Sequence, residues 1–187
     1  KSVLELASGT GEITLLLAEQ FDVDATDLSE DMLLKIKEKD TQNLIHNIYP
    51  LNMLELTNEK TYDNIVCFCD SINYLLNDVE LEQVIERAYE ALNDGGVFMF
   101  DMHTEDRLTA FEDPFIETGK LLDTDYQWTI LSEERYIYHH FVFYEQPIVQ
   151  EYHTQYVFDL KVVLSLLKKY NFTATVYTDF DQPGVLD

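Results

Sequence analysis

The sequence predicts a doubly wound α/β domain with a mostly parallel sheet and a β-rich antiparallel insertion. From Val3 to Phe100, short apolar runs alternate with helical patterns, which is the rhythm of strand–helix–strand units. After residue 125 the hydrophobic period shifts towards two, as in antiparallel hairpins, and a helical pattern resumes after Asp159. We therefore divide the 187 residues into an α/β core at 1–103, an insertion at 104–158 and a return to the core at 159–187.

In the first half of the core, strands and helices alternate at short intervals. Val3 to Leu6 and Val23 to Thr26 are apolar runs of strand length, and each precedes a helical pattern. The two helices are expected at Glu12 to Gln20 and at Glu30 to Lys39. Ser29 is a good N-cap for the second helix because its hydroxyl can accept a hydrogen bond from the first turn.

In the second half of the core, the strongest helical pattern covers Glu80 to Leu92, with apolar residues on one face. Asn77 or Asp78 can cap its start, and the segment from Asn93 to Gly96 is expected to end it because glycine tolerates the left-handed conformation. Val97 to Phe100 then reads as a buried strand.

The insertion shows alternation over two runs. Residues of one expected sheet face are Tyr136, Tyr138, His140, Val142 and Tyr144, and those of the other face are Ile137, His139, Phe141 and Phe143. A second alternating run covers Val149 to Phe158. Asp159 then caps a helix with Leu160, Val163, Leu164 and Leu167 on one face, and Phe172 to Tyr177 is strand-like. The final strand expected after Phe180 is incomplete, because Asp187 follows too soon.

Composition and charge narrow the function. The chain is 46% hydrophobic and 26% charged, as in a folded domain that needs no disulfide or metal staple. Two cysteines, Cys67 and Cys69, are too few for a zinc site or a disulfide framework, so we expect strand packing for both, no metal, and a reducing, cytoplasmic location. Lys1 opens directly into a strand-like run without a signal-peptide pattern, and no apolar run reaches the roughly 18 residues of a membrane span. We therefore expect neither secretion nor contact with a membrane.

The charge balance points to a class of partner. There are 36 acidic and 12 basic residues, for a formal charge of −24, which repels a nucleic-acid backbone. We expect a small-molecule partner that is neutral or cationic and no nucleic acid. A solvated acidic surface without any ligand preference is the alternative explanation. The sequence leaves open whether the protein is a homodimer.

A glycine turn follows the first expected strand. The segment V-L-E-L-A-S-G-T-G-E, from Val3 to Glu12, reads as strand, turn and helix start, and glycines there let backbone amides approach a ligand closely. A dinucleotide fingerprint centred on Gly9 would need glycine at Ala7 and at Glu12. The Glu12 carboxylate also lies where a pyrophosphate would bind, so NAD is disfavoured. A purely structural turn and a different nucleotide remain alternatives.

The spacing E-x-A-x-G-x-G, formed by Glu5, Ala7, Gly9 and Gly11, resembles the first motif of the class I S-adenosylmethionine-dependent methyltransferases. The resemblance implies a Rossmann-like sheet, a turn that wraps the methionine part of the cofactor, and an acidic residue that engages its amino end. Ala7 stands where the family usually has glycine.

Further segments resemble the same family in the same order. T-D-L-S-E-D-M-L, from Thr26 to Leu33, matches its second motif, so Asp27 would accept hydrogen bonds from the ribose hydroxyls and Leu28 would pack on the adenine. Within L-N-M-L-E-L, Asn52 and Met53 would flank the adenine; Asn52 stands where the family commonly has aspartate.

The fourth expected strand, Y-D-N-I-V-C-F-C-D-S-I-N-Y-L, begins at Tyr62 and most resembles a group of poorly characterised bacterial methyltransferases. Asp70 and Tyr74 would then contact the cofactor at the carboxyl end of the sheet. Asn73 would position the methyl acceptor.

Three further groups are candidates for the acceptor side or its surroundings. His103 could orient the acceptor or take its proton, or it could be a capping or surface histidine. Trp128 is a candidate on the substrate side, with plain core packing as the alternative. His139, His140 and His153 lack a metal-like spacing and are interpreted as structural or surface residues.

The resemblance implies methyl transfer to a nitrogen or oxygen of a small molecule, with the β-rich insertion covering the reactive end of the cofactor. The alternative is a regulatory module that binds S-adenosylmethionine without methyl transfer, suggested by Ala7 and by the absence, before Lys1, of the helices that usually cover the cofactor.

Overall fold

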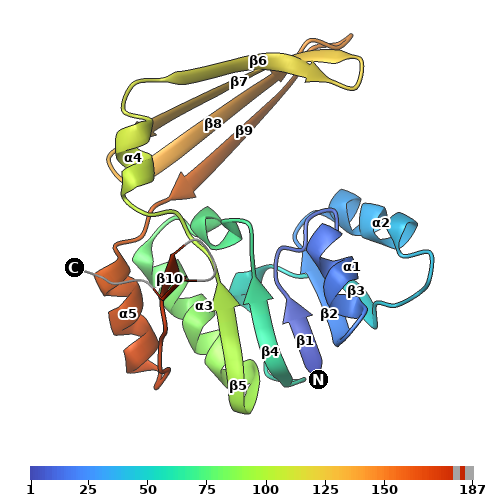
Figure 1. The fold of residues 1–187 in the computed structure, drawn as a ribbon, viewed down its shortest axis with the longest axis vertical. Helices are drawn as coiled ribbons and strands as arrows, with labels where there is room; N and C mark the ends of the chain where they lie inside the picture. The colour runs from blue at the N-terminus through green and yellow to red at the C-terminus, as the bar shows by residue number, and fades with distance from the viewer. Residues whose placement is uncertain (179–181, 184–187) are drawn as a thin grey trace.

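A five-stranded parallel sheet forms the centre of the molecule, and a four-stranded antiparallel sheet projects from it (Figure 1). The computed structural model describes residues 1–178 and 182–183; the final strand expected between Phe180 and Asp187 lies largely outside them. The parallel sheet has the order β3-β2-β1-β4-β5. Its strands are β1 (Ser2–Glu5), β2 (Asp22–Asp27), β3 (Asn47–Pro50), β4 (Tyr62–Cys67) and β5 (Leu92–Phe100). This arrangement confirms the predicted fold class.

Helices cover both faces of the parallel sheet (Figure 1). One face packs against α1 (Glu12–Ala18) and α2 (Glu30–Lys39), and the other against α3 (Asp78–Ala91) and α5 (Leu160–Lys169). The short helices η1 (Met53–Glu55) and η2 (Ser71–Tyr74) follow β3 and β4. The sheet is therefore doubly wound, and its carboxyl edge remains open towards the antiparallel sheet.

Side-chain caps mark the starts of three helices: α2 and α5 begin where the sequence predicts, and α3 begins at Asp78, two residues before the predicted Glu80. Ser29 Oγ accepts a hydrogen bond from Met32 N, Asn77 Oδ1 accepts one from Glu80 N, and Asp159 Oδ1 accepts one from Lys161 N. Each cap satisfies a backbone donor that has no partner within its own helix. The predicted range of α2 agrees with the structure at both ends.

The segment after α3 differs from the prediction. The helix ends at Ala91, and β5 already begins at Leu92, which pairs with Tyr62 before a shift of register. The strand is also not buried, since Val97 is 45% and Met99 is 47% exposed. The reason is its position: β5 is the edge strand of the sheet in the described residues, and α1 and α2 cover the strands on the far side of β4.

The antiparallel sheet has the order β6-β7-β8-β9. Its strands are β6 (Phe115–Leu121), β7 (Thr124–Glu133), β8 (Tyr136–Phe143) and β9 (Val149–Tyr156). The short helix α4 (Asp106–Ala110) lies where this sheet joins β5. Ile130, Ile137 and Val157 form a small buried cluster at this junction. The alternation predicted for 136–144 is therefore that of a real sheet with two distinct faces.

The chain returns to the core through α5, which buries Val163 and Leu167. The predicted strand Phe172 to Tyr177 does not form: residues 172–176 have no regular structure, and only β10 (Tyr177–Thr178) and β11 (Gln182–Pro183) pair. Phe172 instead packs its ring against Tyr89 and Phe98, with centroids 5.7 and 6.3 Å away. Phe172 is apolar because it packs against α3 and β5, and not because its segment pairs with another strand. This contact explains why the segment resembled a strand.

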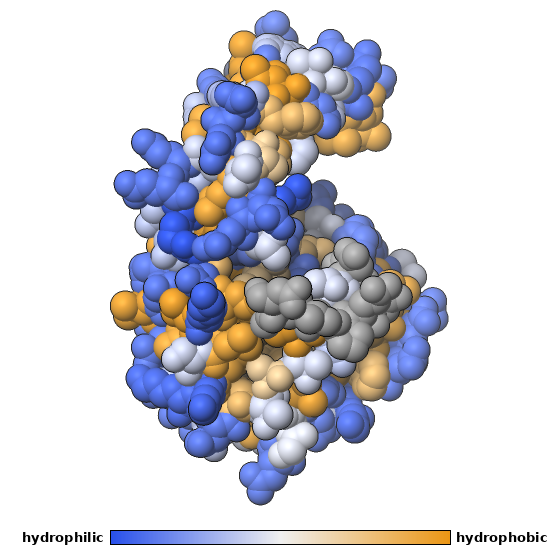
Figure 2. All heavy atoms as spheres, turned by 60° about the vertical axis from the view of Figure 1, so that its left-hand side comes forward, coloured by the Kyte–Doolittle hydropathy of each residue, from blue (hydrophilic) through white to orange (hydrophobic). Residues whose placement is uncertain are grey.

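The antiparallel sheet forms a second lobe that is joined to the α/β core on one side, with a hollow between the two (Figure 2). The carboxyl ends of the parallel strands point towards this hollow (Figure 1). Ligands of open α/β sheets bind at this edge. None of the helices in the part of the chain that the structure describes has the length and apolar character needed to cross a membrane.

Candidate active site

The glycine turn between β1 and α1 uses left-handed backbone at three positions. Ala7 has φ 54°, Gly9 has φ 54° and Gly11 has φ 85°. A Cβ on Gly9 would meet no atom within 4 Å, so this turn faces open space. A Cβ on Gly11 would lie 2.9 Å from the side chain of Ile36, so this glycine is needed for the packing of α1 against α2. The two glycines therefore have different physical roles, although both belong to one motif.

Glu5 ends β1 directly beneath this turn. Its side chain is only 3% exposed and accepts a hydrogen bond of 2.5 Å from the Thr14 hydroxyl. Burial raises the pKa of Glu5 to about 7, against the opposing effect of the hydroxyls of Thr14 and Ser8. The carboxyl group is therefore poised to ionise near neutral pH when a cation approaches it.

Asp27 ends β2 and holds the turn from the side. Its Oδ2 accepts a hydrogen bond of 2.8 Å from Gly9 N, and its Oδ1 accepts one of 2.8 Å from Ser29 N. A carboxylate has about four acceptor positions, so both oxygens can still receive further donors. Leu28, next in the chain, is 74% exposed. An acidic group and an apolar side chain thus lie together at the open edge, and their predicted contacts with ribose and adenine stay predictions.

The residues after β3 are less available to a ligand. Asn52 Oδ1 accepts a hydrogen bond from Leu54 N and caps η1, while Met53 packs against the larger core cluster. Both lie at the carboxyl edge, beyond the end of β3. Their predicted contact with adenine remains a prediction.

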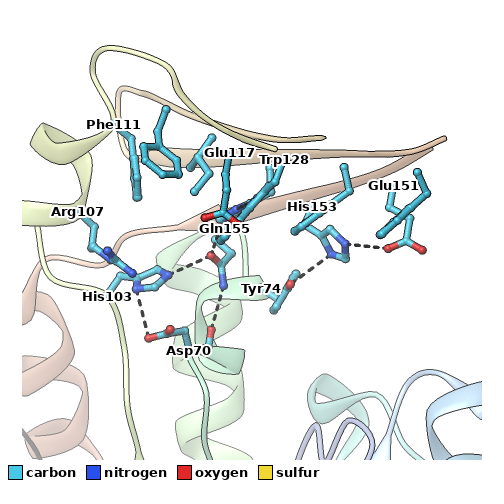
Figure 3. Close-up of a pocket in the computed structure, with 15 residues that line it drawn as sticks. Asp70, Tyr74, His103, Arg107, Phe111, Glu117, Trp128, Glu151, His153 and Gln155 are labelled. Carbon is cyan, nitrogen blue, oxygen red and sulfur yellow. Dashed lines mark hydrogen bonds and ion pairs between the residues drawn. The ribbon is translucent and has the colours of Figure 1, made fainter. Parts of the chain in front are cut away.

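A cavity of about 710 Å³ lies between the carboxyl ends of β4 and β5 and the inner face of the antiparallel sheet (Figure 3). Its lining combines aromatic, acidic and imidazole groups. It is formed by Asp70, Tyr74, His103, Arg107, Phe111, Phe115, Glu117, Trp128, Ile130, His139, Phe141, Phe143, Glu151, His153 and Gln155. The volume is that of a small-molecule site.

A chain of hydrogen bonds crosses the cavity wall (Figure 3). His103 Nδ1 lies 3.2 Å from Asp70 Oδ1, and His103 Nε2 lies 3.0 Å from Gln155 Oε1. The same Gln155 oxygen lies 3.0 Å from His139 Nε2, and Trp128 Nε1 donates to His139 Nδ1 at 3.2 Å. Because the indole can only donate, the ring proton of neutral His139 is on Nε2.

The pKa of His139 is lowered, mainly because burial disfavours its charged form, although the contact with Gln155 opposes the shift. His139 is therefore a neutral link between Trp128 and Gln155. His103 differs, since both of its ring nitrogens face oxygen atoms of Asp70 and Gln155. In this arrangement His103 connects the core to β9.

Asn73 does not reach the cavity, which corrects its predicted role in acceptor positioning. Its side chain is fully buried, and both polar atoms serve the backbone: Nδ2 donates to Tyr156 O at 2.8 Å and Oδ1 accepts from His103 N at 3.0 Å. Asn73 therefore fastens η2 to β9 and to the segment that carries His103. Its neighbour Tyr74 is 48% exposed and lines the cavity, and the Tyr74 hydroxyl oxygen lies 3.3 Å from His153 Nδ1.

His139 and His153 both line the cavity, and their interpretation as structural or surface residues stays a prediction. Only His140 lies on the opposite face, where it stacks on Tyr152 with centroids 4.4 Å apart. Strand packing was expected for both cysteines. Cys67 is buried as expected, whereas Cys69 is exposed and has a left-handed backbone conformation.

Sequence reasoning missed the cavity residues Glu117, Glu151 and Gln155, and Arg107 and Phe111 beside them. The alternation indicates only that neighbouring strands also have inward-facing residues; which residues these are depends on the register, and Arg107 and Phe111 belong to α4 and its end rather than to a strand. His139, Phe141 and Phe143 were placed on one face, and the strands on either side of β8 must contribute their own inward residues to that face.

The residues at the glycine turn fit S-adenosylmethionine. Gly9 leaves room for a ligand against the backbone, buried Glu5 can take a cationic amino group, and Asp27 can take hydroxyls. Among the described residues, no cluster of histidine, cysteine or acidic side chains has metal-binding geometry.

This fold and turn define the class I S-adenosylmethionine-dependent methyltransferases. A family profile described as a methyltransferase domain matches residues 3–96, and the chain belongs to this family.

Comparisons with individual proteins agree with this class. A protein of Geobacillus sp. (strain WCH70) assigned as a methyltransferase is 34% identical over 131 residues, which are 69% of this chain and 53% of the relative. The chain thus spans about half the length of that relative. An S-adenosylmethionine-dependent methyltransferase from Clostridium acetobutylicum has a TM-score of 0.81 at 25% identity, over 90% of this chain and 72% of that one. A sugar N-methyltransferase from Streptoalloteichus sp. shares the fold, with a TM-score of 0.73 at 20% identity over 91% and 71% of the two chains.

Proposed function

We propose that this chain holds S-adenosylmethionine along the carboxyl ends of β1, β2 and β3 and transfers its methyl group to a small molecule in the cavity. The observation that carries the proposal is the meeting of the two regions at Asp70 and Tyr74. Both residues follow β4, which is the parallel neighbour of β1, and both line the cavity. A ligand along the glycine turn would therefore end where the cavity begins.

We assign the cofactor contacts by position along this edge. Glu5 would face the amino end, the turn at Ala7, Gly9 and Gly11 would face the methionine part, and Asp27 would face the ribose hydroxyls. Leu28, Asn52 and Met53 would surround the adenine, and Asp70 and Tyr74 would lie nearest the reactive end. The open space at Gly9 and the exposure of Leu28 support these assignments.

When bound, the cofactor supplies a methyl group on a positively charged sulfur, which leaves as a neutral thioether. The protein therefore has to orient the acceptor and exclude water, and no covalent nucleophile is needed. The Asp70 side chain is 38% exposed at the cavity wall, with His103 behind it at 3.2 Å. We assign to this pair the proton that a protonated acceptor nitrogen must lose before its lone pair can form the bond to the methyl carbon.

Nitrogen is the acceptor that we favour over oxygen. The cavity holds three carboxylates, from Asp70, Glu117 and Glu151, against one arginine. Such a lining attracts a positively charged amine more strongly than a neutral alcohol. The Streptoalloteichus protein of the same fold is named for N-methyl transfer to a sugar. The formal charge of −24 argues against nucleic acid as acceptor.

The test begins with calorimetric titration of the chain with S-adenosylhomocysteine, with NAD as the control. One-to-one binding of the first ligand alone is expected. The chain is then incubated with S-adenosylmethionine and matched amines and alcohols, and released S-adenosylhomocysteine is measured by mass spectrometry. Release with amines supports the proposal, while binding without release across the panel favours a regulatory module. Absence of binding overturns both.

A further inference from the structure

One row of side chains crosses all four strands of the antiparallel sheet on its inner face. Glu117 of β6 pairs with Trp128 of β7, Trp128 with Phe141 of β8, and Phe141 with Glu151 of β9. All four line the cavity. At a strand spacing of about 4.8 Å, the backbones of the two acidic residues lie about 14 Å apart. The row therefore presents two aromatic rings between two carboxylates.

The two rings form a stacked apolar centre. Trp128 and Phe141 have centroids 5.1 Å apart and planes within 12° of each other. The stack continues to Phe143, whose ring lies 6.2 Å from that of Phe141 at 6°. Stacked rings on a sheet hold one another in place, so an apolar ligand finds a preformed surface here.

The carboxylates at the two ends have no lysine or arginine as an ion-pair partner among the described residues, and the His153 ring lies beside Glu151. Glu117 accepts a hydrogen bond of 2.6 Å from the Tyr126 hydroxyl, and Glu151 lies 3.7 Å from His153 Nε2. The one basic residue of the lining, Arg107, lies over the Phe111 ring at 5.4 Å, at the other end of the cavity from Glu151 (Figure 3).

We propose that this row, Glu117–Trp128–Phe141–Glu151, selects an acceptor with an apolar body and an ammonium group, and binds that cation before any chemistry. The inference rests on the proposed function for the identity of the occupant as acceptor. Two carboxylates in a partly enclosed cavity lower the free energy of a bound cation. A neutral ligand of the same shape gains only the apolar contact, and an anion of that shape is repelled.

The experiment uses the full chain without cofactor and three probes of one shape: benzylamine, benzyl alcohol and benzoate. Trp128 is the only tryptophan of the chain, so its fluorescence reports directly on the row. Benzylamine is expected to bind on the order of tenfold more tightly than benzyl alcohol, as for a hydrogen bond to a charged group, and benzoate most weakly. Equal binding of all three, a preference for benzoate, or no binding of benzylamine in the millimolar range would overturn the proposal.

Variants then locate the preference. The double change Glu117→Gln with Glu151→Gln keeps the shape of both side chains and is expected to bring benzylamine down to the affinity of benzyl alcohol. Glu133→Gln removes the same charge from an exposed position of β7 outside the cavity lining and should leave the preference unchanged. Circular dichroism checks the fold, and if the double variant unfolds, each single change should lower the preference part of the way. A preference that survives both single changes contradicts the proposal.

The proposed function and this inference can fail separately. The fluorescence titration contains no S-adenosylmethionine, so it does not depend on methyl transfer. Selective binding of benzylamine by a chain that does not bind S-adenosylhomocysteine would leave the cation site in place and remove the proposed function. The reverse result would leave the methyltransferase and remove the cation site.

Discussion

The glycine turn and the inner face of the antiparallel sheet are built from contacts of very different range. In the turn, Gly9 donates to Asp27 only 18 residues away. At the cavity, Gln155 meets His103, 52 residues away, and donates to Asp70 O, 85 residues away. The first region presents backbone and two carboxyl groups, while the second presents side chains from four strands. A local motif can therefore indicate the proposed cofactor site, whereas the proposed acceptor site depends on how strands pair.

The two regions also differ in how many residue types each position can tolerate. Gly11 is constrained by the Ile36 side chain, and Ala7 by its left-handed backbone, so the turn tolerates few residue types. Inner-face residues such as Glu117 and Phe141 are constrained only by which face they occupy. A family that keeps one cofactor and changes its acceptor can do so by substituting this face, without disturbing the parallel sheet.

The largest effect should come from Glu5→Gln. Burial raises the Glu5 pKa to about 7 from an ordinary 4.5, so the native state binds more protons than the unfolded state between these values. The stability that protonated Glu5 contributes is present below the lower pKa and is lost as pH rises through the upper one. Glutamine does not titrate. From about pH 5 to about pH 8, urea unfolding should therefore show the variant gaining on the order of 3 kcal/mol over the parent.

Glu19→Gln is the matched control, since Glu19 is exposed at the end of α1. It should follow the pH dependence of the parent. If Glu5→Gln also follows the parent curve, the carboxyl group is not desolvated in the native state, and its role beneath the turn would have to be reconsidered.

Asp27→Ala should weaken cofactor binding by roughly 1.5 to 3 kcal/mol, the range for hydrogen bonds to a charged group. The change removes the carboxylate assigned to the ribose and also the acceptor for Gly9 N and Ser29 N. Calorimetric titration with S-adenosylhomocysteine measures the effect. Asp31→Ala, in the exposed first turn of α2, should leave the affinity alone. Equal affinities for both variants would remove Asp27 from the cofactor site.

Asn73→Ala tests how the antiparallel sheet is attached to the α/β core. The change leaves Tyr156 O and His103 N without their partners, which costs about 1 to 3 kcal/mol of folding free energy. Hydrogen exchange should become faster in β9, because the hydrogen bond from Asn73 of η2 to Tyr156 O is lost. Asn58→Ala, at an exposed position, is the control in both measurements. Unchanged exchange in β9 would show that the other contacts of the sheet with the core, such as Tyr74 with His153, hold β9 without Asn73.

Periodicity predicted most of the fold because burial on one face shapes both helices and strands. The errors have a common cause. Val97 to Phe100 and Phe172 to Tyr177 are apolar runs whose neighbours in space decide their state, and the sequence does not say that β5 is an edge or that Phe172 packs on Tyr89. Hydrophobic residues indicate that a segment is buried, but they do not indicate which element buries it.

The candidate site divides in the same way. Residues of the turn and strand ends could be proposed from the resemblance, because their spacing lies within one strand–turn–helix unit. Gln155, Glu117 and Glu151 could not, because a residue is placed in the cavity only once the register of β6 to β9 is known. The amide group of Asn73 and its place after the fourth strand predict a role beside the acceptor, whereas its burial follows only from the packing of β9 against η2.

The smallest effect is expected from Ala7→Gly, which sharpens the comparison at the one place where the turn departs from its family. Alanine in the left-handed region, here with φ 54°, costs about 1 to 2 kcal/mol, and glycine removes that strain. Glycine also adds about 0.5 to 1 kcal/mol of entropy to the unfolded chain, so the net gain in stability should lie between about 0 and 1.5 kcal/mol. Titration with S-adenosylhomocysteine should show affinity changed by less than about threefold, because the turn already forms with alanine. A gain of more than about tenfold would show instead that the Ala7 methyl group obstructs the cofactor, as the regulatory alternative implies.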